Sequence, residues 1–223
     1  MGRRALRKAD PSLDLSAHLT TLDELPRPWD PVPLFGRRAS LEVEVGSGKG
    51  LFLRSAAARR PGTDFLGIEV SRKYARSAAA ALAKRNLQNA IVVVADALRV
   101  FAEVLPDASL AAVHVYFPDP WWKKRHKKRR LMRESFARDV ERTLRSGGRL
   151  HSWTDVEEYF HTSLELFAAH TVLEGPLDVP ESPAEHDMDY RTHFERRVRL
   201  HGGTVYRAEF QKRGAGPFSR KGP

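Results

Sequence analysis

An acidic residue between two prolines heads the most distinctive stretch of the sequence, Phe117 to Arg130. Asp119 follows an apolar run that fits a strand, and each neighbouring proline fixes its own φ and lacks a backbone donor. A residue before a proline is disfavoured in the right-handed helical region, so we expect Phe117 and Asp119 to be extended and stiff. A carboxylate held at a rigid strand end is well placed for chemistry on a ligand. The alternative is an ordinary loop whose prolines end a strand.

Aromatic and basic residues follow this corner directly. Trp121 and Trp122 come after Pro120, and seven of the eight residues from 123 to 130 are Lys or Arg. The formal net charge is +10, so all other positions together contribute only +3 and the excess is local. A local excess favours a polyanion site, with basic side chains on phosphates and indoles stacked on bases. A solvated basic face beside a buried tryptophan is the alternative.

A glycine-rich turn lies between a short strand pattern at 41–45 and a helical pattern that runs to about residue 60. Strand, glycine turn and helix open many nucleotide-binding sheets. The spacing here is G-x-G-x-G, which also occurs in plain tight turns. Glu69 ends the next strand, 64–69, and lies 21 positions after Gly48. That gap is close to the ~20 residues at which a carboxylate reaches ribose hydroxyls in such units.

Further strand patterns occur at 90–95, 111–117, 149–154 and 204–211, mostly separated by helical patterns. The continuous apolar run at 90–95 fits a strand buried on both faces, as in parallel sheets. The alternation predicts an α/β fold with a doubly wound, mostly parallel sheet whose late strands can be antiparallel. Ligands of such sheets bind outside the carboxyl ends of the strands. The acidic residues expected at or near those ends are Glu44, Glu69, Asp96, Asp119 and Asp155.

The same patterns set the expected boundaries. Residues 1–40 form an extended basic and proline-rich lead-in, residues 41–211 form the single domain, and residues 212–223 form a flexible basic tail. Residues 175–190 lack periodicity, and a loop of this length is either functional or loose.

Two helical stretches late in the chain have residues that mark where they begin or end. Apolar residues at four-residue spacing from Met132 to Leu144 predict a helix that ends at Gly147-Gly148. Thr192 opens a second helical stretch that ends at Gly202-Gly203.

Composition excludes several classes of protein. The chain has 223 residues, 41% of them hydrophobic, so it can fold as one domain. It has no cysteine, which removes disulfides, thiolate metal sites and a cysteine nucleophile. The nine histidines form no pair at metal-binding spacing, so no metal is expected. No apolar run approaches the ~20 residues of a membrane span, and no signal-peptide pattern opens the chain. A cytoplasmic protein that does not enter membranes is expected.

The five acidic residues Glu44, Glu69, Asp96, Asp119 and Asp155, here called the acidic rim, narrow the choice of ligand. The pyrophosphate of a dinucleotide is anionic and would be repelled by these carboxylates. S-adenosylmethionine has no phosphate, and it presents a sulfonium cation, two ribose hydroxyls and an adenine. Methyl transfer therefore fits the rim better than hydride transfer does.

Five short motifs occur in a fixed order over residues 44 to 202, most of the chain. They are E-V-G-S-G-K-G at Glu44–Gly50, G-I-E at Gly67–Glu69, F-P-D-P-W-W-K-K-R-H-K-K-R-R at Phe117–Arg130, T-D-V-E-E-Y-F at Thr154–Phe160 and T-H-F-E at Thr192–Glu195, with Gly202 downstream. With these motifs the chain resembles the bacterial tRNA (guanine-N7)-methyltransferase family. The motif around Asp119 is highly specific, and the others are weak singly. Glu42, a second acidic residue in a strand expected to be apolar, departs from the family pattern.

The resemblance implies the seven-stranded class I methyltransferase fold, with methyl transfer from S-adenosylmethionine to N7 of a guanine in the variable loop of tRNA. It makes Asp119 the catalytic residue, and leaves open a monomer or a homodimer. The cofactor site would comprise Glu44, Gly46, Gly48, Gly50, Glu69, Asp96 and Asp119. Guanine and tRNA contacts would come from Lys123, Asp155, Thr192, His193, Phe194 and Glu195. The RNA backbone would be held by Lys124, Arg125, Lys127, Lys128, Arg129 and Arg130.

Structural roles compete with several of these assignments. Asp96 can be the N-cap of a helix, and Thr192 with Glu195 matches a capping box, as Asp155 with Glu158 does. Two other functions also compete with the first. A non-catalytic RNA-binding protein is disfavoured by the acidic rim, and a methyltransferase for proteins or small molecules is disfavoured by the basic run.

Overall fold

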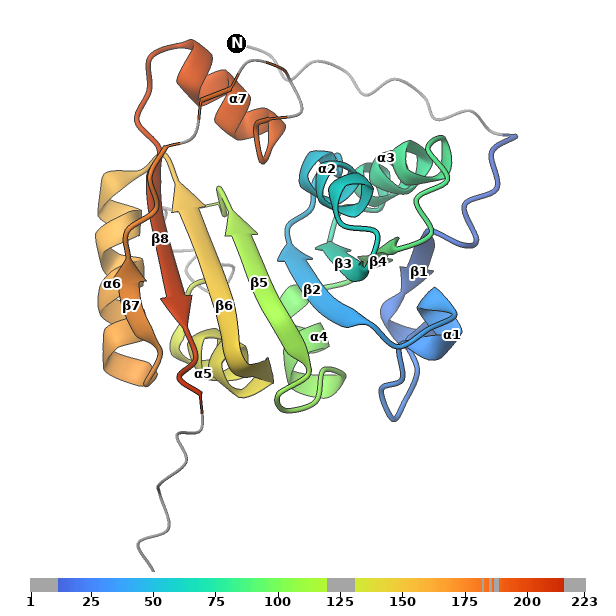
Figure 1. Cartoon of the computed structure of the whole chain (residues 1–223), viewed down its shortest axis with the longest axis horizontal. Helices are drawn as coiled ribbons and strands as arrows, with labels where there is room; N and C mark the ends of the chain where they lie inside the picture. The colour runs from blue at the N-terminus through green and yellow to red at the C-terminus, as the bar shows by residue number, and fades with distance from the viewer. Residues whose placement is uncertain (1–11, 120–130, 182, 185, 187–188, 215–223) are drawn as a thin grey trace, which may run out of the picture.

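The computed structural model describes residues 12–119, 131–181, 183–184, 186 and 189–214. One sheet runs through the molecule, with helices packed on both of its faces (Figure 1). The basic run at 123–130, Trp121 and Trp122 lie outside the described residues.

The sheet has eight strands, in the order β1-β4-β3-β2-β5-β6-β8-β7. The neighbours from β1 to β6 are parallel, while β8 is antiparallel to both β6 and β7. This arrangement confirms the doubly wound, mostly parallel fold with a late antiparallel strand. The strands are β1 (Leu19–Thr21), β2 (Ser40–Val45), β3 (Thr63–Glu69), β4 (Ala90–Val94), β5 (Leu110–Tyr116), β6 (Leu144–Thr154), β7 (Glu174–Leu177) and β8 (Tyr206–Gln211).

Helices form a layer on each face of the sheet. Helices α2 and α3 pack against β3 and β4 through Phe52, Leu53, Ala78 and Leu82, and α4, α5 and α6 bury their apolar stripes against the opposite face. The 3₁₀ and α helices are η1 (Leu22–Glu24), α1 (Val32–Phe35), α2 (Leu51–Arg59), α3 (Arg72–Ala83), α4 (Ala97–Glu103), α5 (Glu134–Thr143), α6 (Glu157–His170) and α7 (His193–Leu200). Helix α7 lies above the upper ends of β6 and β8 in Figure 1.

Two strands come from segments without a strand pattern. β1 lies in the expected lead-in and pairs with β4 at one edge of the sheet, and β7 begins beside the expected 175–190 loop and pairs with β8 at the other edge. The sheet therefore has eight strands where seven were expected. Both added strands are only three or four residues long, too short for an alternating pattern to be recognised.

The helix predicted to end at Gly147-Gly148 ends earlier, so that prediction was wrong in its boundary. Helix α5 stops at Thr143, whose hydroxyl donates to the Asp139 carbonyl over 2.8 Å. Leu144 is extended, fully buried and already paired with Leu110 of β5. Pairing with β5 therefore places Leu144 in the sheet and not in the helix. Gly147 and Gly148 lie where the register between β5 and β6 shifts, before Arg149.

Glu42, which departs from the family pattern, lies in a buried polar cluster on the α2 face of the sheet. Its carboxylate accepts two bonds from Arg60, at 2.5 and 2.9 Å, and one of 2.8 Å from His114 Nε2. The other ring nitrogen of His114 is 2.9 Å from the Tyr116 hydroxyl. A neutral His114 that donates to Glu42 and accepts from Tyr116 satisfies all these groups.

The electrostatics of the cluster agree with a neutral His114. Burial lowers the pKa of His114 to about 3, although the bond to Glu42 opposes that shift. Burial alone would raise the pKa of Glu42, but the hydrogen bonds from His114 and Arg60 and the charge of Arg60 outweigh it and lower that pKa to about 2. Glu42 is therefore an ionised, fully partnered carboxylate in the core.

We predict that acid destabilises the fold through His114. Its folded pKa, about 3, lies below its ordinary 6.5, so the unfolded chain binds the extra proton between these values. Stability is therefore full above pH 6.5 and falls as the pH drops toward 3, by up to about 1.4 kcal/mol per pH unit. Urea unfolding between about pH 5.5 and 7 measures this slope, because in that range Glu42 is ionised in the folded protein and, with an ordinary pKa of 4.5, largely ionised in the unfolded chain as well.

The substitution His114→Gln keeps a neutral polar group and should flatten the slope. His201→Gln is the matched control, because His201 is exposed and bonds only a carbonyl of its own helix. An unchanged slope in His114→Gln would show that His114 does not supply this pH dependence.

Candidate functional site

The carboxyl ends of β4, β3, β2, β5 and β6 lie side by side at the same end of the sheet (Figure 1). The chain moves outward from β2 to β3 and β4, and then returns to the other side of β2 as β5 and β6. The strand order therefore reverses between β2 and β5, which is where open α/β sheets bind ligands. The loops that carry Gly46–Gly50 and Phe117–Asp119 leave the sheet on the two sides of this point.

The glycine loop is shaped by left-handed residues and fixed by Glu69. Gly46, Gly48 and Gly50 have φ values of 75°, 55° and 70°. Glu69 Oε2 accepts a bond of 2.9 Å from the Gly48 amide, and Oε1 accepts one of 2.8 Å from the Ser71 amide. Each oxygen keeps a lone-pair direction for a further donor. The glycine turn and Glu69, which sequence spacing related to each other, are thus in direct contact.

Two independent features of the structure exclude a side chain at Gly50. Its left-handed φ disfavours any residue with a Cβ, and an added Cβ would lie 2.8 Å from the Cβ of Ala78 in α3. The Gly50 amide also donates to the Ser47 carbonyl over 2.8 Å. This position therefore allows the loop to lie close to the helical layer, which was not evident from the weak G-x-G-x-G spacing.

Two buried polar groups beside this loop are incompletely satisfied. Glu44 is 3% exposed and its Oε2 has no hydrogen-bond partner, and the hydroxyl of Ser47 is likewise buried without a partner. Burial and the nearby Glu69 carboxylate raise the pKa of Glu44 well above its ordinary value. A buried carboxyl in this state favours a cationic ligand, which would restore its charge. A sulfonium-bearing cofactor fits this donor and acceptor set, and a phosphate does not.

Asp96 and Asp119 follow β4 and β5 at the same end. Asp96 is the N-cap of α4, with Oδ1 accepting from the Leu98 amide over 2.9 Å, so the capping interpretation is confirmed. Asp96 and Asp119 are both exposed. Capping occupies one oxygen of Asp96 and does not prevent a ligand contact by the other.

The backbone beside Asp119 differs from expectation. Phe117 was predicted to be extended, but its φ is +52°. The rule for residues before proline excludes the right-handed helical region and does not by itself impose an extended backbone. The Phe117 amide still bonds the Trp153 carbonyl, at 2.8 Å, so the chain turns only after the ladder is complete. The turn costs about 1–3 kcal/mol, a strain that often occurs at functional sites.

The Phe117 ring lies against α7 and compensates part of that strain. It packs against Phe194 in a tilted arrangement, with 5.1 Å between ring centroids, and the Arg197 guanidinium lies 4.4 Å from the Phe194 centroid. This contact joins the loop that carries Asp119 to the helix that carries the T-H-F-E motif. Sequence reasoning missed the pair, although both aromatic residues lie within the motifs.

The T-H-F-E segment has both structural and exposed members. Thr192 caps α7 by accepting from the Glu195 amide over 3.0 Å, which is one half of the expected capping box. The Glu195 carboxylate instead accepts from the Arg191 amide, at 2.6 Å, and contacts Arg199 and Arg207. Glu195 is only 2% exposed, while His193 and Phe194 are exposed.

Asp155 follows β6 and is exposed. The N-cap of α6 is Val156, and no side chain caps that helix, so the capping interpretation of Asp155 is wrong. Asp155 therefore has no capping duty that would compete with a ligand. The remaining predicted contacts lie outside the described residues: Lys123, Lys124, Arg125, Lys127, Lys128, Arg129 and Arg130.

The described residues contain neither a metal-binding cluster nor a membrane-spanning helix. No group of three or more His, Cys, Asp or Glu side chains is placed to hold a metal ion. No helix in that part of the chain is both long and apolar enough to cross a membrane.

Comparison with known proteins identifies the family. The sequence model of a family described as "Putative methyltransferase" matches residues 38–208. A tRNA (guanine-N(7)-)-methyltransferase of Rhodopirellula baltica is 49% identical over 96% of this chain and 81% of its own length. Another, of Cupriavidus necator, is 40% identical over 85% of this chain and 73% of its own length.

Solved structures support the fold. A 30S ribosomal A1408 methyltransferase from an uncultured bacterium matches with a TM-score of 0.52 and 18% identity, over 81% of this chain and 91% of that one. At that identity the likeness concerns the fold alone. The family model and the two relatives carry the assignment: the chain belongs to the tRNA (guanine-N(7)-)-methyltransferase family.

Proposed function

We propose that this protein transfers a methyl group from S-adenosylmethionine to N7 of a guanine in the variable loop of tRNA. The observation that carries the proposal is the buried, unpartnered Glu44 carboxyl beside the Gly46–Gly50 loop, in a chain of this family. That site favours a cation and disfavours phosphate, which separates a sulfonium cofactor from a dinucleotide.

The cofactor, when bound, supplies an electrophilic methyl group on sulfur. Glu69 is proposed to accept hydrogen bonds from the ribose hydroxyls, because its two oxygens keep free lone-pair directions toward the rim. Glu44 offsets the positive charge of the ligand. The Gly46–Gly50 loop allows close approach, and Asp96 contacts the ligand through the oxygen that does not cap α4.

Guanine N7 carries a lone pair that is free at neutral pH, so no proton has to be removed before methylation. The main task of the protein is alignment of N7 with the methyl carbon. Methylation places positive charge on the base, and an ionised Asp119 next to it stabilises that charge as it develops. The Phe117–Phe194 contact positions the Asp119 loop against the segment proposed to hold the guanine.

Three carboxylates are candidates to accept hydrogen bonds from guanine N1–H and N2–H₂. Asp119 and Asp155 are exposed at the rim. Glu195 is already bonded to Arg191, Arg199 and Arg207. We therefore assign the guanine edge to Asp119 and Asp155, and assign Glu195 the task of holding Thr192, His193 and Phe194 against the base. The basic run at 123–130 is proposed to bind the RNA backbone.

A single experiment tests the proposal against the competing functions. The protein is incubated with labelled S-adenosylmethionine and tRNA from cells that lack this modification, and the tRNA is then digested to nucleosides. Label in 7-methylguanosine supports the function. Label in another nucleoside or in protein indicates a different substrate, and tRNA binding without label or cofactor binding indicates a non-catalytic RNA-binding protein.

The substitution Glu69→Ala should weaken cofactor binding and leave the fold intact. It removes charge-assisted hydrogen bonds to the ribose, and their loss should cost on the order of 1.5–3 kcal/mol. Calorimetric titration with S-adenosylmethionine measures the loss, and circular dichroism monitors the fold. Glu69→Gln keeps part of the bonding and should fall between the two. Equal affinity in wild type and Glu69→Ala would remove Glu69 from the cofactor site.

Cofactor binding should release a proton through Glu44. In the free protein the pKa of Glu44 is raised, so the carboxyl holds a proton at pH values below that raised pKa. A bound sulfonium favours the ionised form, so cofactor affinity should rise with pH until the free carboxyl is itself ionised. Titrations in two buffers with different ionisation enthalpies count the protons released. The Glu44→Gln variant should release none, and equal release by both proteins would exclude Glu44 as the source.

Asp119→Asn should lower the rate of methyl transfer. It keeps the size of the side chain and removes the charge that offsets the methylated base, so the rate should fall by one to several powers of ten, about 1.4 kcal/mol for each. Single-turnover methylation at saturating tRNA and cofactor measures the rate. Asp107→Asn is the control, because Asp107 is 77% exposed and lies before β5, at the opposite end of the sheet. A rate for Asp119→Asn within about threefold of wild type would mean that Asp119 only shapes a proline corner.

A further inference from the structure

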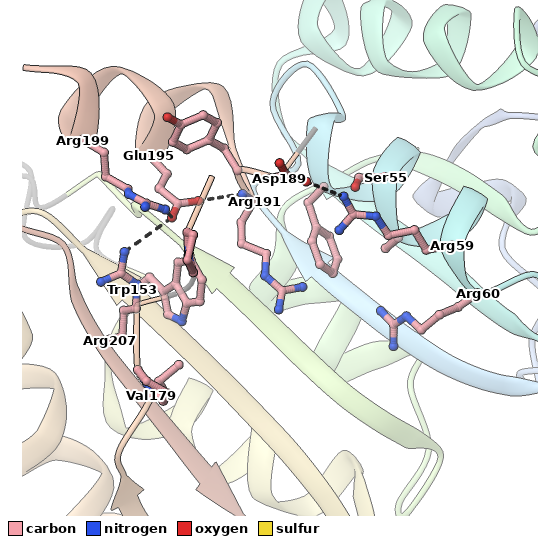
Figure 2. Close-up of a pocket in the computed structure, with 15 residues that line it drawn as sticks. Ser55, Arg59, Arg60, Trp153, Val179, Asp189, Arg191, Glu195, Arg199 and Arg207 are labelled. Carbon is pink, nitrogen blue, oxygen red and sulfur yellow. Dashed lines mark hydrogen bonds and ion pairs between the residues drawn. The ribbon is translucent and has the colours of Figure 1, made fainter. Parts of the chain in front are cut away.

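A cavity of about 410 Å³ lies beside the rim, between α2 and the strands β6 and β8 (Figure 2). Its volume is within the ~300–1,000 Å³ of ligand pockets. None of the predicted cofactor residues lines it, and Glu195 is the one predicted substrate residue that does. Its walls carry Arg59, Arg60, Arg191, Arg199, Arg207 and Trp153.

Four of the five arginines have carboxylate partners. Arg59 pairs with Asp189 at 3.1 Å, and Arg60 pairs with Glu42 beneath the cavity. Arg199 and Arg207 share Glu181 and Glu195, at 2.9 to 3.5 Å. The charges of these four arginines are therefore balanced within the described residues. Arg191 is the fifth arginine of the wall, and it has no carboxylate partner there.

The guanidinium of Arg191 is held by rings and not by acids. It lies 5.6 Å from the ring centroid of Trp153 and 5.9 Å from that of Phe52. No hydrogen bond or ion pair of this guanidinium occurs among the described residues. Figure 2 shows Arg191 pointing into the cavity, between Trp153 and the side of α2 that carries Arg60. Its five N–H donors are thus available to a ligand.

Trp153 forms an aromatic wall of the cavity beside Arg191. It lines the cavity, is 7% exposed, and its indole Nε1–H is buried without a hydrogen-bond partner. The indole nitrogen is thus shielded from the cavity, and the ring contributes its face to the Arg191 guanidinium. The guanidinium is the group that requires acceptor oxygens and negative charge from a ligand.

The position of the cavity suggests where such oxygens come from. Arg191 directly precedes Thr192, and its backbone amide is bonded to Glu195 over 2.6 Å. The cavity therefore adjoins the segment that is proposed to hold the guanine. A nucleotide next to the target base brings its phosphate within the same region of the protein.

We infer that this cavity is a phosphate-binding pocket centred on Arg191, and that it takes the backbone phosphate of a tRNA nucleotide next to the target guanine. The planar guanidinium binds phosphate oxygens in a bidentate manner. The assignment to RNA rests on the proposed function. A free nucleotide phosphate has the same chemistry, and the test distinguishes the two sources.

The test measures binding of unmodified tRNA over a series of salt concentrations for wild type, Arg191→Gln, Arg191→Lys and Arg145→Gln. Arg191→Gln should weaken binding by roughly tenfold and lower the log–log salt slope by about 0.7–0.9, the value of one phosphate contact. Arg191→Lys should keep most of the slope. Arg145→Gln loses the same charge from an exposed position near the start of β6, at the opposite end of the sheet, and should match wild type.

A second arm titrates inorganic phosphate and uridine 5′-monophosphate into wild type and Arg191→Gln. If Arg191→Gln loses binding of these probes but keeps the tRNA slope, the RNA assignment is overturned in favour of a free nucleotide. If neither measurement changes, the phosphate pocket is overturned. Affinity for S-adenosylmethionine and circular dichroism should be unchanged in every variant. Nucleoside analysis of wild-type product tests the proposed function separately, because the salt slope is measured without methylation.

Discussion

The central strand of the sheet is buried on both faces, and this constraint determines how the protein can use the charges it carries there. Val43 and Val45 of β2 face one core, while Glu42 and Glu44 face the α2 side. A buried charge must be partnered or lost. Glu42 is ionised because Arg60 and His114 surround it. Glu44, two residues further on, has neither a guanidinium nor an imidazole partner among the described residues, and burial beside Glu69 raises its pKa. The charge of Glu42 is balanced within the fold. We propose that Glu44 becomes ionised and partnered only when a cationic ligand binds.

Much of this arrangement follows from sequence because local rules and tertiary structure agree. The β4 strand is a continuous apolar run, and the left-handed turn after β2 requires glycines such as Gly48. Glu69 could be related to that turn by its position at a strand end, and the structure places the Gly48 amide 2.9 Å from its carboxylate. Each of these features is fixed by residues that are close in sequence or by the regular geometry of a βαβ unit.

The predictions that failed concern positions where a distant partner decides. Leu144 matches a helical repeat, but its partner in β5 places it in a strand. Phe117 precedes a proline, but its contact with Phe194, from a helix 77 positions further along the chain, accompanies a left-handed turn. Asp155 and Glu158 match a capping box that does not form. A local sequence pattern cannot reveal such distant contacts, because the conformation it predicts and the conformation observed are both acceptable to the neighbouring residues.

The charge distribution separates two ligands of opposite sign within a short span of the chain. The acidic rim carries Glu44 and Glu69, which we propose for a cationic cofactor, and the neighbouring cavity carries Arg191, which has no acidic partner among the described residues. Tertiary pairing produces this separation, since the other four arginines of the cavity wall pair with Asp189, Glu42, Glu181 and Glu195. On this proposal a polyanionic substrate would be repelled by the rim and attracted beside it, so that its backbone would lie over the cavity. The target base, which is uncharged until it is methylated, is the part of the nucleotide that can enter the acidic site. Placing the RNA backbone on one side of Thr192 and the carboxylates on the other would therefore orient the guanine before any base-specific contact forms.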